Sequence, residues 1–416
     1  MDHASSRLFV TRRQAVRGGA ALAVAPALAM PFVGDAEAAA PLKIGMVLAK
    51  TGSLVDQSEY LAAGTVMALE EANNTVLGRP CQIVWLDEPT PQAAQQNMQK
   101  LIQEQRVIAV IGGALSSDAL AMESVAGRLK MPFVITNAAA REITGRDCNR
   151  YTFRLQPDVP VQARVLSPYL MGYGRKWYFI TANYAFGQDI RRTFQDLLKA
   201  AGGSVVGDDQ VPLGTPDYSS FILKIREAKP DMILGGIVGG DLSTFLKQWN
   251  ELGMKGKIPF AEIAIGDTDI WGVGPEAATG IFTSMWWYKN PANTPEEQNF
   301  AAAYLKRHGK PAADKAWMGW IGMRSLLGGI ELAKSTAPAA IVRGLESWRT
   351  KVGDLEVGYR KFDHQLVLRT LVIETKPKIT DKWDYFDVKA ALPKTAAELP
   401  AVFGSEQEVG CHMAAI

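Results

Sequence analysis

The feature that most constrains this chain is the regular alternation of short apolar runs with longer amphipathic segments. The first apolar run, Leu42–Leu48, ends before a turn signal, Thr51–Ser53. Small and apolar residues then recur at helical spacing and predict the buried face of a helix: Leu61, Thr65, Ala68, Leu69 and Ala72. Repeated strand–helix units form parallel sheets with helices on both faces. We therefore expect an α/β fold built from doubly wound sheets.

The strand–helix pattern occurs twice along the chain. The first set of expected strands continues with Cys81–Leu86, Val107–Ile111, Pro132–Ile135 and Thr152–Leu155. The second set comprises Lys176–Thr181, Ser204–Val211, Asp231–Leu234 and Phe260–Ile265. Two successive sheets of similar size predict two Rossmann-like lobes. Two later helices, Glu296–His308 and Ala316–Ala333, suggest that the chain crosses back.

Length and composition agree with two folded lobes and exclude some classes of protein. The chain has 416 residues, more than one compact core usually supports. Its 47% apolar and 21% charged residues are typical of a globular protein. A formal net charge of +2, without a cluster of Lys and Arg among aromatic residues, argues against nucleic acid as a partner.

Residues 1–40 have the pattern of an export signal. Arg12 and Arg13 precede an apolar stretch, Gly18–Val33, which is too short to span a bilayer. The small residues of Ala36–Ala40 suit a cleavage site. We expect export to the periplasm, and the paired arginines resemble a twin-arginine signal, although Ala15 stands where that pattern prefers a bulky apolar residue. An uncleaved anchor and a disordered tail are the alternatives.

Three cysteines, Cys81, Cys148 and Cys411, remain after the expected cleavage. One disulfide with a spare thiol is possible outside the cytosol, but the spacing does not assign a pair. Buried or free thiols are the interpretation that the sequence favours. The histidines are scattered and give no zinc pattern, so we predict no metal and no cofactor.

The most informative turn is Gly112–Asp118, which lies between an expected strand and an expected helix. The glycines allow a sharp turn, and Ser116 or Ser117 can cap the helix. The free N–H groups of the first turn, together with the helix dipole, would then bind a carboxylate without Lys or Arg. A capped helix start facing water is the alternative.

Other strand ends add candidate groups for a pocket. After the next strand, Ala138 and Ala140 are small enough to let a ligand reach the backbone, although a tight loop explains them equally well. Tyr184 and Phe186 follow a strand of the second set and predict an aromatic wall, with packing beneath a helix as the alternative. Glu262 could meet a ligand ammonium, or it could be an ordinary charged residue.

Motifs that would indicate an enzyme are weak. The stretch Gly272–Ala277 matches GxGxxA, but Pro275 removes an N–H and no apolar strand leads into it. The sequence contains no GxxxxGK[ST], HExxH or GxSxG motif. A binding protein without chemistry explains the sequence better.

The order of these pieces is similar to that of a known family. The chain has an export signal, then LKIGMVLAKTGSL, VIAVIGGALSSDAL, PFVITNAAAREITG, CNRYTFRLQPD, KWYFITANYAFGQDI and GGIVGGD. This order resembles the periplasmic substrate-binding proteins of branched-chain amino acid type ABC transporters, over Leu42 to about Glu374. The resemblance implies two lobes joined by three crossovers, near Arg154–Asp158, Met285–Tyr288 and Gly358–Phe362. It places residues 41–156 and 287–359 in the N-terminal lobe, and 157–286 and 360–416 in the C-terminal lobe.

The resemblance also implies roles for particular residues. The serine at the position of Ser116 holds the ligand carboxylate, and the carbonyl at the position of Ala138 takes the ammonium. This chain departs from the amino acid binders at Ala140, where they usually have threonine, and Glu262 aligns only within a residue with their acid. The carboxylate half of the site matches the family's pattern, whereas the ammonium half departs from it. The expected ligand is a small carboxylate, an amino acid or an aromatic acid, and the departure favours a carboxylate without a normal α-amino group, such as an aromatic acid, or an amide.

These observations lead to one hypothesis and two alternatives. We expect a monomeric, non-catalytic periplasmic protein that closes its lobes on a small organic ligand and delivers it to an inner-membrane ABC permease. The first alternative is a ligand-sensing module that signals to a membrane receptor. The second is an exported hydrolase, which would need a histidine or an acid beside Ser116.

Overall fold

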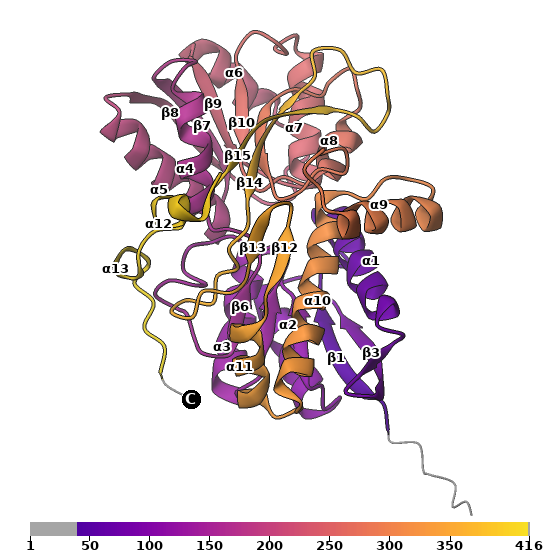
Figure 1. Ribbon diagram of the computed structural model, residues 1–416. Helices are drawn as coiled ribbons and strands as arrows, with labels where there is room; N and C mark the ends of the chain where they lie inside the picture. Colours follow the sequence, from indigo (N-terminus) through magenta and orange to yellow (C-terminus); the bar gives the residue numbers. More distant parts are fainter. Residues whose placement is uncertain (1–39, 415–416) are drawn as a thin grey trace, which may run out of the picture. The chain divides into compact units, whose positions relative to one another are not determined.

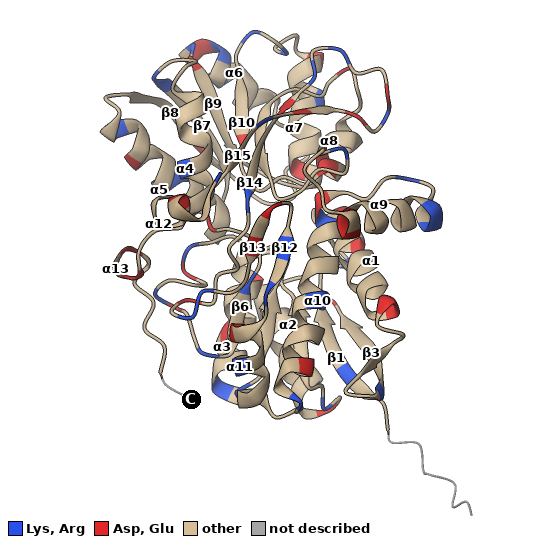
Figure 2. Ribbon diagram, in the orientation of Figure 1, with Lys and Arg blue, Asp and Glu red and all other residues tan. Residues whose placement is uncertain are grey.

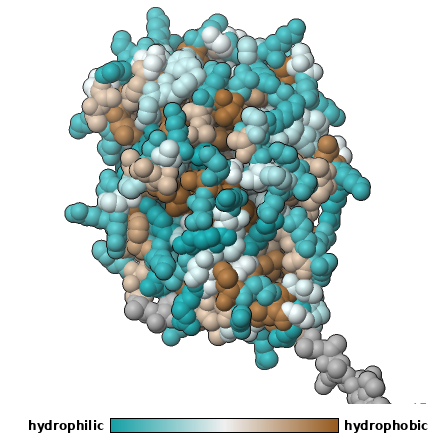
Figure 3. Space-filling view, viewed as in Figure 1, coloured by the Kyte–Doolittle hydropathy of each residue, from teal (hydrophilic) through white to brown (hydrophobic). Residues whose placement is uncertain are grey.

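Figure 1 shows a computed structural model of the chain, which describes residues 40–414. The predicted export signal lies outside the described residues, apart from Ala40. No helix in the described part is long and apolar enough to cross a membrane. On the face shown in Figure 3, hydrophobic residues form small patches separated by hydrophilic ones.

The first sheet contains six strands in the order β2-β3-β1-β4-β5-β6. All neighbouring strands run parallel except β2 and β3. The strands are β1 (Leu42–Val47), β2 (Thr75–Val76), β3 (Arg79–Leu86), β4 (Ala109–Gly112), β5 (Phe133–Ile135) and β6 (Thr152–Arg154). The helices that connect them are α1 (Val55–Glu71), α2 (Pro91–Gln103) and α3 (Ser116–Leu129).

The second sheet has seven strands in the order β15-β14-β11-β10-β9-β7-β8. Its strands are β7 (Lys176–Ala182), β8 (Ser204–Val211), β9 (Met232–Gly236), β10 (Phe260–Glu262), β11 (Ile281–Ser284), β14 (Thr370–Thr375) and β15 (Phe386–Leu392). The helices are α4 (Val159–Leu170), α5 (Ala185–Ala200), α6 (Ser219–Ala228), α7 (Gly240–Glu251) and α8 (Asp267–Val273). The strands from β7 to β11 are parallel, while β14 and β15 are antiparallel additions. The predicted α/β class with two doubly wound sheets is confirmed.

Some details of the sequence prediction are wrong. The strand expected over Phe260–Ile265 ends at Glu262, because the chain turns at Ala264, whose φ is 58°. The pattern also gave no indication of β11, β14 or β15. The last two are antiparallel strands outside any βαβ unit, so a search for strand–helix alternation does not find them.

After β11 the chain returns to the first sheet, as the late helical stretch suggested. The returning elements are α9 (Pro295–His308), α10 (Asp314–Ala333), α11 (Pro338–Ser347), β12 (Thr350–Val352) and β13 (Leu355–Val357). Helix α10 packs closely on α1 because both carry glycine where they meet. A Cβ atom at Gly64 would lie 1.8 Å from the Ala316 carbonyl oxygen, and one at Gly319 would lie 2.0 Å from that of Leu61. The two helices therefore approach backbone to backbone.

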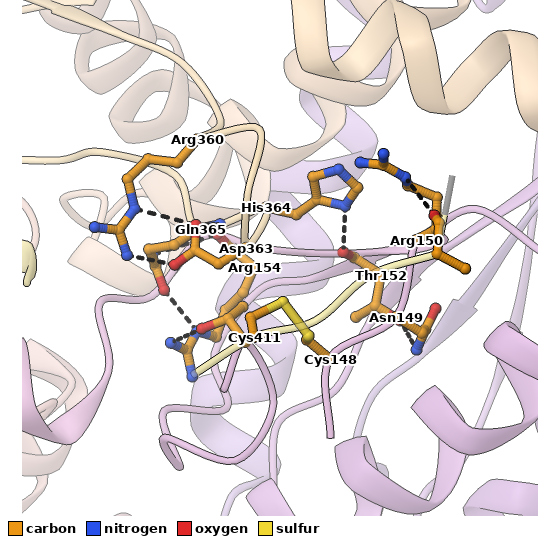
Figure 4. The surroundings of a disulfide bond; sticks show 12 residues. Cys148, Asn149, Arg150, Thr152, Arg154, Arg360, Asp363, His364, Gln365 and Cys411 are labelled. Atoms are coloured by element: carbon orange, nitrogen blue, oxygen red, sulfur yellow. Dashed lines mark hydrogen bonds and ion pairs between the residues drawn. A yellow bond between two sulfur atoms is a disulfide. The ribbon is translucent and has the colours of Figure 1, made fainter. Parts of the chain in front are cut away.

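Two connections between the sheets meet at one buried arginine. Arg154, the last residue of β6, is fully buried and donates from Nε to Gln365 Oε1 at 2.7 Å. Its Nη1 donates to the Ala140 carbonyl at 2.6 Å, and its Nη2 lies 3.4 Å from Asp158 Oδ2. Gln365 belongs to the chain that runs from β13 to β14, and Figure 4 shows this cluster. Arg154 thus joins the segment after β6 to the segment before β14. The exact lobe boundaries remain a prediction.

Three consecutive aromatic residues, Trp286, Trp287 and Tyr288, follow β11, and at least the first two pack against other parts of the core. Trp286 stacks on Trp317 of α10, with ring centroids 6.2 Å apart. Trp287 meets Phe386 of β15 edge to face, at 5.3 Å. Both indoles are buried, and neither lines the cavity described below.

The cysteine prediction is wrong for two of the three thiols. Cys148 and Cys411 form a disulfide, while Cys81 is buried and free. The two bonded residues are 263 positions apart, and their Cα atoms are 5.8 Å apart. Only the fold brings them together, so no local spacing signalled this pair.

Candidate ligand-binding cleft

A small cavity lies where the carboxyl ends of the two sheets face each other. We call the first sheet with the helices packed on it the first half of the molecule, and the second sheet with its helices the second half. The first half contributes these lining residues: Leu54, Gln57, Ala114, Ser116, Asn137, Ala138 and Ala139. From the second half the cavity is lined by Tyr184, Phe186, Val238 and Ala264. Its volume of about 10 Å³ suffices for roughly one water molecule. The two halves therefore lie close together around this cavity.

The topology of the sheets explains this position. In the first sheet β1 lies between β3 and β4, and in the second β7 lies between β8 and β9. The connections from β1 and β4 leave in opposite directions, as do those from β7 and β9, so each sheet has a crevice at its carboxyl edge. The lining residues follow β1, β4, β5, β7, β9 and β10.

Ser116 is the first residue of α3, and it does not cap the helix as the sequence predicted. The N-cap position is Leu115, which makes no side-chain hydrogen bond to the helix. Instead, Ser116 Oγ accepts the N–H groups of Ala139 and Ala140, both at 3.2 Å. A hydroxyl has two lone pairs and one hydrogen, so Ser116 keeps its O–H free to donate toward the cavity. This arrangement suits a carboxylate.

The structure brings four of the seven predicted site residues to the cavity: Ser116, Ala138, Tyr184 and Phe186. The two aromatic rings are 6.0 Å apart between centroids. Tyr184 is the N-cap residue of α5, and Phe186 lies in the first turn of that helix. Both residues line the cavity, and their role as an aromatic wall for a ligand stays a prediction.

The other three predicted residues do not line the cavity. Ser117 lies at the seam between the two halves, where its Oγ accepts the Ala185 N–H at 3.4 Å. The Ala140 backbone is used by Ser116 and Arg154. The carboxyl group of Glu262 is fully buried beside Gly235, where an added Cβ would lie 2.5 Å from Glu262 Oε2.

Two polar lining residues, Gln57 and Asn137, were missed by the sequence interpretation. Asn137 Nδ2 donates to the Ala114 carbonyl at 3.2 Å and to Gln57 Oε1 at 3.3 Å. Asn137 stands between the small residues that the sequence singled out, which was a usable signal. Gln57 had no local signal, because its strongest partner, Asp269, lies 212 positions away.

The cavity lining itself carries no charged side chain, although acids lie close behind it. Burial and the charge of Asp87 raise the pKa of Asp118 to about 7. Burial and Asp269 raise the pKa of Glu262 well above its usual range, and the Ile237 amide opposes them only in part. Burial, followed by the charges of Glu262 and other acids, also raises the pKa of the Tyr184 hydroxyl. The protonated forms of these groups are thus favoured beside the cavity.

The two halves are joined across the cleft by several hydrogen bonds. Gln57 Nε2 donates to Asp269 Oδ2 at 2.6 Å, which links α1 to α8. The Gly240 N–H donates to the Ser53 carbonyl at 2.9 Å, and the Asp314 N–H donates to Asp267 Oδ2 at 3.0 Å. Figure 2 shows acidic residues on α8, which contacts α1. These bonds connect the two halves around the cleft.

Comparison with known proteins agrees with this geometry. Residues 41–378 match the model of a family described as periplasmic binding protein. The chain belongs to this family. The chain is also similar to the Leu/Ile/Val-binding protein homolog 7 of Brucella melitensis, 28% identical over 361 residues, covering 82% of this chain and 90% of that one. Homolog 8 of Brucella abortus is 26% identical and covers 77% of this chain and 84% of its own length.

Solved structures of periplasmic binding proteins share the fold. A periplasmic binding protein from Burkholderia mallei has a TM-score of 0.82 at 24% identity, covering 89% of this chain and 98% of that one. A solute-binding protein of an ABC transporter from Rhodopseudomonas palustris, in complex with 3,4-dihydroxybenzoic acid, has a TM-score of 0.77 at 20% identity. The alignment covers 84% of this chain and 97% of the Rhodopseudomonas palustris protein. The two-lobe architecture of periplasmic substrate-binding proteins, expected from the sequence, is confirmed.

Proposed function

We propose that this protein is the periplasmic solute-binding component of an ABC importer, which captures a small carboxylate-bearing ligand without chemical change. Its family and its similarity to Leu/Ile/Val-binding homologues support the transport role. An inner-membrane permease is then its partner, and the mature protein acts as a monomer. Closure follows from population shift, because the ligand contacts both halves only in the closed state.

The composition of the cavity wall is the observation that carries the choice of ligand. Ser116 offers a free O–H, the apolar side chains and the Tyr184–Phe186 pair suit an aromatic body, and no acid faces the cavity to hold an ammonium. Burying an ammonium without a partner is costly. An aromatic acid therefore fits better than an α-amino acid. Some structural neighbours were solved with such compounds, among them one with benzoate.

Thermal-shift measurements on pairs of compounds test this choice. L-Leucine and 4-methylpentanoate differ only in the ammonium group, and so do L-phenylalanine and 3-phenylpropanoate. Benzoate and 4-hydroxybenzoate complete the set. A compound that binds the native state raises the melting temperature in proportion to the logarithm of its concentration over its dissociation constant. We expect larger shifts from the acids that lack the ammonium. Shifts from α-amino acids alone would contradict the ligand class but not the transport role.

Small-angle X-ray scattering tests the capture mechanism itself. The radius of gyration of the ligand-free protein should decrease as the best compound of the thermal screen is added to saturation. A radius that stays constant while the melting temperature rises would argue against hinge closure. A sensing module would also close on its ligand, so transport itself is tested by uptake of the labelled compound in cells with and without this chain.

A further inference from the structure

The C-terminal segment crosses from the second half of the molecule to the first. It begins with η1 (Ala396–Glu398) and α12 (Leu399–Phe403), and continues through α13 (Glu406–Val409) to Cys411. Figure 1 shows it in yellow along one side, from α4 and α5 toward the loops below. This crossing is additional to the connections that follow β6, β11 and β13.

The start of the crossing is fixed to the second half. Helix α12 packs against α4, with Val402 and Phe403 buried. Arg164 of α4 donates to the Val402 carbonyl at 3.1 Å. Arg360, in the connection from β13 to β14, also donates from Nη1 to the carbonyls of Phe403 and Gly404, at 3.2 and 2.9 Å. Apolar burial against α4 and the hydrogen bond from Arg164 thus anchor this end to the second half.

The far end is fixed covalently to the first half. Cys411 is bonded to Cys148, in the loop between β5 and β6 (Figure 4). The next residue in that loop, Asn149, donates to the Glu123 carbonyl of α3 at 3.3 Å and to Thr152 Oγ1 at 2.9 Å. Arg150 pairs with Glu346 of α11 at 2.9 Å. The disulfide therefore attaches the segment to a loop that is held by α3, β6 and α11.

Between its two ends the segment is loosely held. Residues 405–408 are exposed, and a cavity of about 260 Å³ lies beside them, lined by residues such as Arg141, Arg192 and Phe403. The nearest charge contact is a 3.7 Å pair between Arg164 and Glu408. The four residues of α13 rise about 1.5 Å each as a helix but about 3.3 Å each when extended, so unwinding releases roughly 7 Å of chain.

We propose that residues 404–411, which we name the C-terminal strap, form a covalent limiter of cleft opening. The proposal rests on the proposed opening and closing of the cleft. The strap follows a small opening by unwinding α13 and then becomes taut, because both its ends are fixed. Removing the widest open states leaves a larger fraction of the ligand-free protein near the closed form, and a ligand that binds the closed form gains affinity accordingly.

Scattering by the ligand-free mature protein tests the strap, with three samples compared. The first is the oxidised protein. The second is the same protein reduced by dithiothreitol, whose two thiols pass two electrons and two protons to the disulfide sulfurs and close to a ring disulfide. The third carries six Gly and Ser residues inserted after Gly404, which lengthen the strap while the disulfide stays intact. Cys81→Ser serves as the control, since it leaves the strap unchanged.

We expect a larger radius of gyration for the reduced and the lengthened forms than for the oxidised form and the Cys81→Ser control. The lengthened form keeps the proposal testable if reduction destabilises the fold. Equal radii that all exceed the value calculated from the closed structure would overturn the strap and leave the hinge intact. Equal radii that all match the closed structure would overturn both.

Discussion

Gln57 of α1 and Asp269 of α8 form a short side-chain hydrogen bond across the cleft, 2.6 Å from Nε2 to Oδ2, and both side chains are buried. Gln57 Oε1 also accepts Asn137 Nδ2 at 3.3 Å. The closing contact is therefore continuous with the cavity wall. A ligand that orders Asn137 would also order the group that holds the two halves together.

Replacing Gln57 by alanine should favour the open form. The substitution leaves Asp269 without its side-chain partner, which costs about 1–3 kcal/mol in the closed state only. The ligand-free protein should then have a larger radius of gyration. Glu59→Ala, at an exposed position of the same helix, is the matched control and should leave the radius unchanged. A Gln57→Ala protein as compact as the control would show that this bond does not hold the cleft.

Replacing Arg154 should strongly reduce the free energy of unfolding of the protein. Its guanidinium is fully buried among Ala140, Asp158 and Gln365, so Arg154→Met removes the one group that bonds to all three. Breaking a buried pair in this way costs about 3–5 kcal/mol. Arg154→Lys should not restore stability, because an ammonium cannot match the planar fork of donors.

Urea unfolding monitored by circular dichroism measures this cost. Arg146, whose side chain is 73% exposed and pairs only with Glu142 and Asp147, is the matched control. Arg146→Met should change the free energy of unfolding by less than about 1 kcal/mol. Similar losses for the two variants would contradict the role of Arg154 as the buried junction.

The sheets and the aromatic wall could be predicted from local patterns for a physical reason. Strand–helix alternation is local, and parallel strands place their carboxyl ends at one edge, so the amino-acid sequence alone allows Ser116, Tyr184 and Phe186 to be grouped. Contacts between distant segments could not be predicted in this way. The Cys148–Cys411 bond spans 263 positions, and the burial of Glu262 depends on how β9 packs beside β10.

The Asp118 carboxyl should make the stability of the protein vary with pH at higher pH values than an ordinary carboxyl group would. Its pKa is about 7 in the folded protein, raised from 3.8 by burial and then by Asp87. Because this pKa is higher in the folded than in the unfolded chain, the carboxyl stabilises the fold fully below about pH 4, and this contribution is lost as the pH rises through 7. Asp118→Asn removes this loss. The free energy of unfolding of the variant, relative to that of the unsubstituted protein, should therefore be roughly 1–2 kcal/mol larger at pH 8 than at pH 5.

Melting curves between pH 5 and pH 8 measure this effect as the difference between Asp118→Asn and the unsubstituted protein. Using the difference cancels groups that titrate in both proteins. Asp196→Asn, at an exposed position of α5, is the control and should give a flat difference. A flat difference for Asp118→Asn as well would show that this carboxyl is not perturbed by its surroundings.

Ser116 should control ligand affinity through its hydroxyl proton. In Ser116→Ala the ligand loses one donor, and the amides of Ala139 and Ala140 lose their acceptor. We expect binding of the best carboxylate from the thermal screen to weaken by about 1–3 kcal/mol in isothermal titration. Ser116→Thr keeps an acceptor for both amides and a proton for the ligand, so it should retain more of the affinity. Ser347→Ala is the control, because Ser347 is exposed, donates to the Arg343 carbonyl within α11 and does not line the cavity. Equal affinities for the Ser116→Ala and Ser347→Ala proteins would remove Ser116 from the ligand site, since the α3 amides would then suffice for the carboxylate.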